Sequence, residues 1–214
     1  MSFLKNFNAT HLDILKEVGN IGAGHAATAL SKLLNKKIDM KVPDVKVVSF
    51  NEMMDLVGGT DSVVASVFLR VEGDVPGSMF YILSIEQASR FVQQLTNDPT
   101  FSLENPPYPE IALSALQELG NILSGSYLSS FSDFTNLNMY PSVPAISIDM
   151  VGAIISFGLM ELSTVGDYAI LINTALHEED QSVLDSVKGH FFFLPDPESF
   201  SIIFRALGVT DDGQ

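Results

Sequence analysis

The sequence predicts an α+β fold in which a helix, antiparallel strands and a second helix form one unit that occurs twice, related by a pseudo-two-fold axis. The first observation behind this prediction is an internal repeat. The segment 13–24 recurs as 114–125, with 101 positions between equivalent residues. The second observation is that short turns, and no long crossover segments, join the β-rich stretches after each copy. Short turns favour antiparallel strands.

The composition is that of a globular protein with a large core. The 214 residues are 46% hydrophobic. They contain no run of about 18 apolar residues, so no membrane span is expected. The absence of cysteine excludes disulfides, thiolate catalysis and Cys-based zinc sites. The formal charge of -15 disfavours nucleic-acid binding, which needs Lys and Arg. The N-terminal residues lack an apolar export signal, so a cytoplasmic protein is expected.

The first element of each half is a long amphipathic helix. Thr10 and Asp13 form a capping-box-like start, and helical spacing continues toward Leu34. At about 100° per residue, four residues fall within an arc of about 60°, opposite a cluster of apolar side chains. This polar stripe consists of Asp13, Glu17, Asn20 and Gly24. The second helix repeats the stripe with Ser114, Glu118, Asn121 and Gly125.

Glycines are frequent in the first helix, where each costs about 0.5–1 kcal/mol relative to alanine. Gly19 and Gly22 lean toward the apolar side, so we predict that close packing explains them. Gly24 and Gly125 lie one turn beyond each asparagine on the polar stripe. Two interpretations stay open there. The missing side chain lets a partner backbone approach, or it lets the helix pack closely on its twin or on the sheet.

Each long helix is followed by β-rich sequence, which begins after Pro43 in the first half and after Pro144 in the second. Both prolines lie 23 residues after the asparagine of their stripe, so the repeat keeps its register beyond the helices. The first half is predicted to contain strands at 45–50, 63–71 and 79–83 and a helix at 85–95. The second half is predicted to contain strands at 145–148, 153–160 and 168–173 and a helix at 178–187.

A polar, proline-rich connector at 97–109 separates the predicted half-repeats, 1–100 and 110–208. We expect the halves to share one core and to form a single domain over 1–214. The remaining predicted elements are a buried strand segment at 191–193, a terminal helix at 198–207 and a frayed end at 210–214.

The Glu-x-x-Asn pair is the candidate functional motif. A single exposed pair of this kind is usually a solvated helix face. Two copies with the same Gly-Asn context, each followed by a glycine that weakens its helix, indicate a function. A carboxamide can orient a water molecule, and a carboxylate can bind a lysine or act as a base. Such a pair suits hydrolysis of a reactive bond whose metal another molecule supplies.

The pattern Asp/Ser-x-x-x-Glu-x-x-Asn, followed at a distance by Pro, resembles the signature of the CheC, CheX and FliY phosphatase family of bacterial chemotaxis. The first copy matches it with Asp13, Glu17, Asn20 and Pro43. The second copy matches it with Ser114, Glu118, Asn121 and Pro144. Within this family, the similarity to the CheC branch of Bacillus-type bacteria extends nearly end to end.

This resemblance implies a CheC-like fold and hydrolysis of the aspartyl phosphate of the response regulator CheY. Asn20 and Asn121 would place the attacking water, and Glu17 and Glu118 would hold CheY. The chain would need no cofactor of its own, because Mg²⁺ would belong to CheY. The resemblance also implies binding of the receptor deamidase CheD, with the chain a monomer or a heterodimer with CheD. The alternative is a noncatalytic adaptor that uses the same helices only to bind CheY or CheD.

Three other motifs are interpreted as structural. The segment 22–27 fits a dinucleotide-binding pattern, but it lies inside a helix and does not follow a strand. The acidic run 177–180 lacks the paired histidines of a zinc site and is interpreted as a solvated helix start. His25 is interpreted as an ordinary, partly exposed histidine.

Overall fold

The computed structural model describes residues 9–161, 168–178 and 186–208 of the chain. The first half contains α2 (Ala9–Leu34), β1 (Ile38–Lys41), β2 (Val45–Ser49), α3 (Phe50–Leu56), β3 (Val63–Gly73), β4 (Gly77–Ser84) and α4 (Ile85–Thr96). The second half contains α5 (Glu110–Thr135), β5 (Met139–Pro141), β6 (Ala145–Met150), α6 (Val151–Glu161), β7 (Tyr168–Glu178), β8 (Val187–Pro195) and α7 (Pro197–Ala206). The two halves match element for element.

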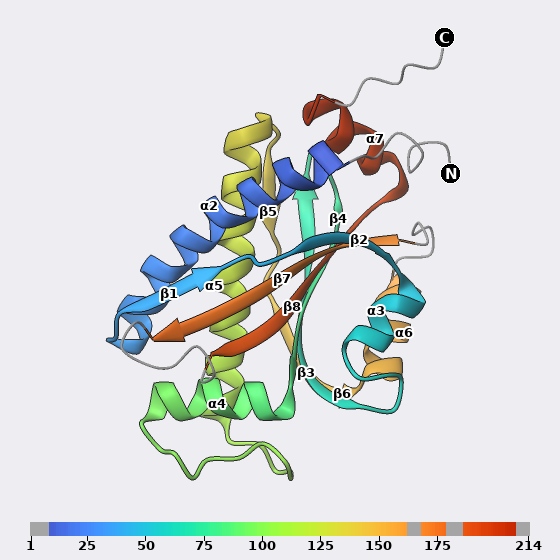
Figure 1. Cartoon of the computed structure of the whole chain (residues 1–214). Helices are drawn as coiled ribbons and strands as arrows, with labels where there is room; N and C mark the ends of the chain where they lie inside the picture. Colours follow the sequence, from blue (N-terminus) through green and yellow to red (C-terminus); the bar gives the residue numbers. More distant parts are fainter. Residues whose placement is uncertain (1–8, 162–167, 179–185, 209–214) are drawn as a thin grey trace.

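A single eight-stranded antiparallel sheet lies between two layers of helices (Figure 1). The long helices α2 and α5 cover one face, where α4 and α7 add their buried side chains to the same core. The short helices α3 and α6 pack on the other face around a smaller core. This arrangement confirms the predicted α+β class with antiparallel strands. No helix among the described residues is long and apolar enough to cross a lipid bilayer.

The two halves exchange strands within this sheet. The strand order is β1-β7-β8-β4-β3-β5, with β2 also paired to β7 and β6 also paired to β3. The short strands of each half therefore pair with the long third strand of the other half. The halves meet in the middle of the sheet, where β4 pairs with β8 and Tyr81 lies opposite Phe191.

The helices α2 and α5 approach each other closely at Gly22. A β-carbon at Gly22 would lie 2.7 Å from Cδ1 of Tyr127 and 3.2 Å from the carbonyl oxygen of Ser126. The prediction that close packing explains Gly22 is confirmed. At Gly19 a β-carbon would make ordinary contacts of 3.5 Å with Val42, so packing there does not require glycine.

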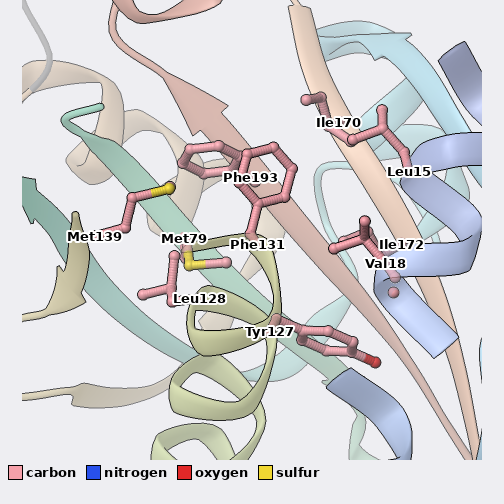
Figure 2. Close-up of a pocket in the computed structure, with 11 residues that line it drawn as sticks. Leu15, Val18, Met79, Tyr127, Leu128, Phe131, Met139, Ile170, Ile172 and Phe193 are labelled. Carbon is pink, nitrogen blue, oxygen red and sulfur yellow. The ribbon is translucent and has the colours of Figure 1, made fainter. Parts of the chain in front are cut away.

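A small apolar cavity of about 30 Å³ lies beneath the two long helices. Figure 2 shows Leu15 and Val18 of α2 on one side of it, Tyr127 and Phe131 of α5 on another, and sheet residues such as Phe193 closing it. The Tyr127 hydroxyl is buried and has no hydrogen-bond partner among the described residues. The cavity is lined almost entirely by apolar side chains and includes none of the polar stripe residues.

The predicted strand at 153–160 is wrong, because helix α6 occupies this segment. The run is almost entirely apolar, and periodicity alone does not distinguish a buried helix from a buried strand in such a run. The structure favours the helix because Val151, Ile154 and Ile155 bury one side of it against the sheet. Its first amides, from Val151 and Gly152, donate to the carbonyl groups of Ser62 and Thr60 at 2.9 Å.

The predicted helix at 178–187 is wrong at both ends. Glu178 ends strand β7 and Val187 begins strand β8, whereas residues 179–185 lie outside the described residues. Glu178 forms an ion pair with Lys36 at 3.2 Å, so its charge is bound at the sheet and does not begin a helix. The helix of the second half that corresponds to α4 is α7. The structure thus confirms the predicted terminal helix, and the predicted strand at 191–193 lies within β8.

Candidate functional site

The first polar stripe lies on the outer face of α2. Asp13, Glu17 and Gly24 are exposed and Asn20 is half-buried, whereas Leu15 and Val18 on the other side of the helix are buried. The carboxamide oxygen of Asn20 accepts a hydrogen bond of 3.1 Å from the backbone N–H of Val42. Val42 immediately precedes Pro43, so the structure places the predicted motif proline next to the asparagine.

The second polar stripe lies on the outer face of α5. Ser114, Glu118 and Asn121 are exposed, and Gly125 is half-buried. The Asn121 amide nitrogen donates to Oε2 of Glu118 at 3.4 Å. Among the described residues, the carboxamide oxygen of Asn121 accepts no hydrogen bond, so it is available to a water molecule or a partner.

An open cleft of about 430 Å³ separates the second stripe from the loop that follows β5. Its walls are formed by Ser114, Gln117, Glu118, Asn121, Pro141, Ser142, Val143 and Pro144. Gln117 spans the cleft, because its amide nitrogen donates to the carbonyl oxygen of Pro144 at 2.6 Å. The cleft therefore brings the predicted Ser114, Glu118, Asn121 and Pro144 together.

The residues Gln117, Val42 and Val143 were missed as part of the two sites. The sequence offered one signal for Gln117. It aligns with Lys16 in the repeat, so the residue before the repeated glutamate differs between the two helices. No local signal distinguishes Val42 from Val143, because the two valines occupy equivalent positions in the repeat.

The structure decides between the two interpretations of Gly24 and Gly125. A β-carbon added at either glycine would have no atom within 4 Å, apart from its own helix backbone and chain neighbours. Close packing on another element is therefore wrong for both residues. Each glycine leaves a bare patch of helix surface one turn beyond the asparagine.

This geometry restricts the chemistry of both stripes. Each Glu-x-x-Asn pair projects from the outer side of a helix, so it does not enclose a small substrate on its own. A reactive bond carried by a partner protein can bring the other walls of such a site with it. A carboxamide and a carboxylate three residues apart can then enter that partner's site together, one to orient water and the other to bind a cation.

The histidines lie outside the stripes. His25 Nδ1 lies 3.4 Å from the hydroxyl of Ser130 on α5. His177 lies within β7, and its Nε2 is 3.3 Å from Asp39 of β1. The interpretation as a helix start is therefore wrong for 177 and 178, and residues 179 and 180 lie outside the described residues. Across residues 9–161, 168–178 and 186–208, His, Asp and Glu side chains form no group of three or more suited to a metal ion.

Comparison with known proteins shows that both stripes lie in segments that match one protein family. The sequence profile of the CheC-like family matches residues 11–47 and 111–148, the two segments that carry the polar stripes and their prolines. The chain is 51% identical over 210 residues to the CheY-P phosphatase CheC of Bacillus subtilis (strain 168), which covers 98% of this chain and 100% of that protein.

Two further similarities concern FliY proteins. Over 136 residues the chain is 32% identical to the flagellar motor switch phosphatase FliY of Bacillus subtilis (strain 168), which covers 64% of this chain and 35% of that protein. The fold is similar to the crystal structure of Thermotoga maritima FliY, with a TM-score of 0.67 and 20% identity over 94% of this chain and 98% of that chain.

Proposed function

Because the chain belongs to the CheC-like family, we propose that it is a phosphatase that hydrolyses the aspartyl phosphate of the response regulator CheY. The observation that carries this proposal is the pair of exposed Glu-x-x-Asn stripes. The sequence identity of 51% to a CheY-P phosphatase, over nearly the whole chain, supports the assignment of the substrate.

In the proposed mechanism, Asn20 and Asn121 place the attacking water. The carboxamide oxygen accepts a hydrogen bond from the water, and the amide nitrogen donates to the charge that develops on the phosphoryl group. Asn121 is suited to this role in the described structure, because its oxygen is free and its nitrogen is weakly held by Glu118 at 3.4 Å.

Glu17 and Glu118 hold CheY in this mechanism by accepting hydrogen bonds from a lysine of the regulator. Both carboxylates are exposed, so a partner can reach them without displacing other parts of the chain. The bare helix surface at Gly24 and Gly125 gives room for the regulator's backbone next to each pair. Mg²⁺ would be held by CheY, where it would neutralise negative charge on the phosphoryl group, and Glu17, Glu118 and the asparagines of this chain would not need to bind it.

We also propose that the chain binds CheD, as a monomer that forms a heterodimer. The family resemblance supports this part of the proposal. A pull-down of purified CheD by the tagged full-length chain tests it, and size-exclusion chromatography with light scattering measures the stoichiometry. CheD that stays unbound at micromolar concentrations of both proteins would contradict it.

The decisive test of the phosphatase is the double substitution Asn20→Ala and Asn121→Ala. We expect it to abolish acceleration of CheY-phosphate decay while binding to phosphorylated CheY is largely retained. Asn51→Ala, at an exposed asparagine of α3, is the matched control. It should accelerate CheY-phosphate decay as much as the unmodified chain does. Unchanged decay with the double variant would overturn the catalytic assignment and favour the noncatalytic adaptor.

A further inference from the structure

The loop that follows the first short strand of each half exposes its valine to solvent in the second half and buries it in the first. Val143 is 86% exposed, whereas the equivalent Val42 is only 2% exposed. Both are valines that immediately precede the motif proline. Their different exposure is therefore set by their surroundings and not by their side chains.

Hydrogen bonds from two elements hold the second loop in place. The Ser142 N–H donates to the carbonyl of Arg70 at 2.8 Å, and the Arg70 N–H donates to the Ser142 hydroxyl at 3.0 Å. On the other side, Gln117 binds the carbonyl of Pro144 at 2.6 Å. Val143 lies between these anchors, so its exposure is built into the loop. In the first half, Lys16 replaces Gln117 and the Val42 N–H is bound to Asn20.

A second exposed apolar side chain flanks the same site. Ile111 is 62% exposed and precedes Glu118 by seven residues, which places it on the same face of α5. Its counterpart in the first half is the polar Thr10. Ile111 therefore lies two turns before Glu118 on α5, and Val143 lies on the wall of the cleft. The first site has Thr10 and the buried Val42 at these positions, and its exposed apolar residue is Ile21, next to Asn20. A protein that covers the polar site would also bury exposed apolar side chains next to it.

We propose that Val143 and Ile111 are docking residues for the phosphorylated response regulator, and that they make the second site the one that binds it more tightly. This inference rests on the proposed function. Val143 lines the same cleft as Glu118 and Asn121, so a protein whose phosphoryl group reaches Asn121 must also cover Val143. Gln117 acts as a positioning residue, because it fixes the loop that presents Val143.

The test uses the full-length chain with Asn20→Ala, in which only the second site operates. Added Val143→Ala should raise KM for CheY-phosphate about fivefold, because burial of the two lost methyl groups no longer contributes to binding. Val143→Asp should raise KM further, since docking would bury an unpaired charge. In both variants kcat should stay within about twofold, because docking groups contribute equally to the bound substrate and the transition state.

Val63→Ala is the matched control. Val63 is 48% exposed at the start of β3, and the loop anchor Arg70 lies toward the other end of the same strand. This variant should leave KM unchanged.

Gln117→Lys, which copies the first half, should raise KM because the loop loses its anchor, again with kcat preserved. Ile111→Ser provides a second docking variant whose exposed position tolerates the change.

The outcomes separate this inference from the proposed function. Unchanged KM in the Val143 and Ile111 variants, with activity still lost when Asn121→Ala is added, would overturn the docking role and leave the phosphatase intact. Activity that survives Asn20→Ala together with Asn121→Ala would instead overturn the phosphatase mechanism. A circular dichroism melt of each variant identifies any loss of folding, and in that event the conservative variants Val143→Ala and Ile111→Ser decide the question.

Discussion

The carboxamide oxygen of Asn20 accepts a 3.1 Å hydrogen bond from the backbone N–H of Val42, whereas that of Asn121 is free among the described residues. The equivalent asparagines of the two repeats therefore differ in the hydrogen bonding of their carboxamide oxygens. In the first site one of the two lone pairs of the acceptor oxygen is already used by the Val42 N–H. In the second site, within the part of the chain that the structure describes, the Asn121 side chain makes one hydrogen bond, which its amide donates to Glu118.

The first prediction is that the two sites differ in turnover. The Val42 N–H uses one lone pair of the Asn20 oxygen and holds this side chain toward its own loop. Breaking that bond to turn the carboxamide toward a substrate costs about 0.5–1.5 kcal/mol. The Asn121→Ala variant, which uses only the first site, should therefore have a kcat about two- to tenfold below that of Asn20→Ala. Steady-state hydrolysis of CheY-phosphate at saturating substrate measures the ratio. A first site as fast as the second would show that the Val42 bond does not restrain Asn20.

The second prediction concerns two glycines of one helix. Gly22→Ala should destabilise the fold by about 1–3 kcal/mol, because the new methyl group meets the Tyr127 ring and the Ser126 carbonyl. Gly24→Ala meets no atom of another element and should stabilise the fold by about 0.5–1 kcal/mol through helix propensity. Urea denaturation of the two variants gives both values. Equal effects would contradict the close contact of α2 and α5.

The third prediction concerns Tyr127. Burial raises the pKa of its hydroxyl strongly, and that hydroxyl has no hydrogen-bond partner within residues 9–161, 168–178 and 186–208. Tyr127→Phe removes an unsatisfied polar group and keeps the ring that packs 5.0 Å from Phe191. We expect the free energy of unfolding to rise by about 1 kcal/mol, measured by urea denaturation. Tyr108→Phe, at a half-buried tyrosine of the connector, is the control. A loss of stability would reveal a partner for the Tyr127 hydroxyl.

The fourth prediction is a pH dependence of stability from His190. Burial lowers the pKa of this histidine below its ordinary value of 6.5, and its Nδ1 lies 2.7 Å from Oδ1 of Asn173. Because the unfolded state binds the proton more readily, the free energy of unfolding should fall as the pH drops below about 6.5. His190→Gln should flatten this part of the profile, as thermal melts across a pH series would show. A profile with the same slope in the variant would assign the dependence to other groups.

Much of the fold and of the candidate site followed from the repeat. The stripe of Glu17 and Asn20 could be placed on one helix face because helical geometry fixes which residues share a side. The second stripe followed from the common register. The α+β class followed from the short turns between strands, which leave antiparallel pairing as the simple solution.

The remaining features depend on contacts between distant residues. Val42 and Val143 are identical in type and repeat position, yet Gln117 and Arg70 hold one loop outward while the other packs against α2. Helix α6 was missed because an almost entirely apolar segment carries no periodic signal of its own. Its conformation is determined by the sheet beneath it.

The strand exchange has a consequence for synthesis of the chain on the ribosome. β1 and β2 can pair only when β7 follows, since Ile38 lies opposite Glu178 and Val45 opposite Ile172. Domains generally fold as units as they emerge from the ribosome. Here the first half cannot complete its sheet until β7 of the second half has been synthesised. During that interval its edges and its apolar faces remain exposed. The nascent chain is therefore expected to need protection by chaperones until translation has passed β8.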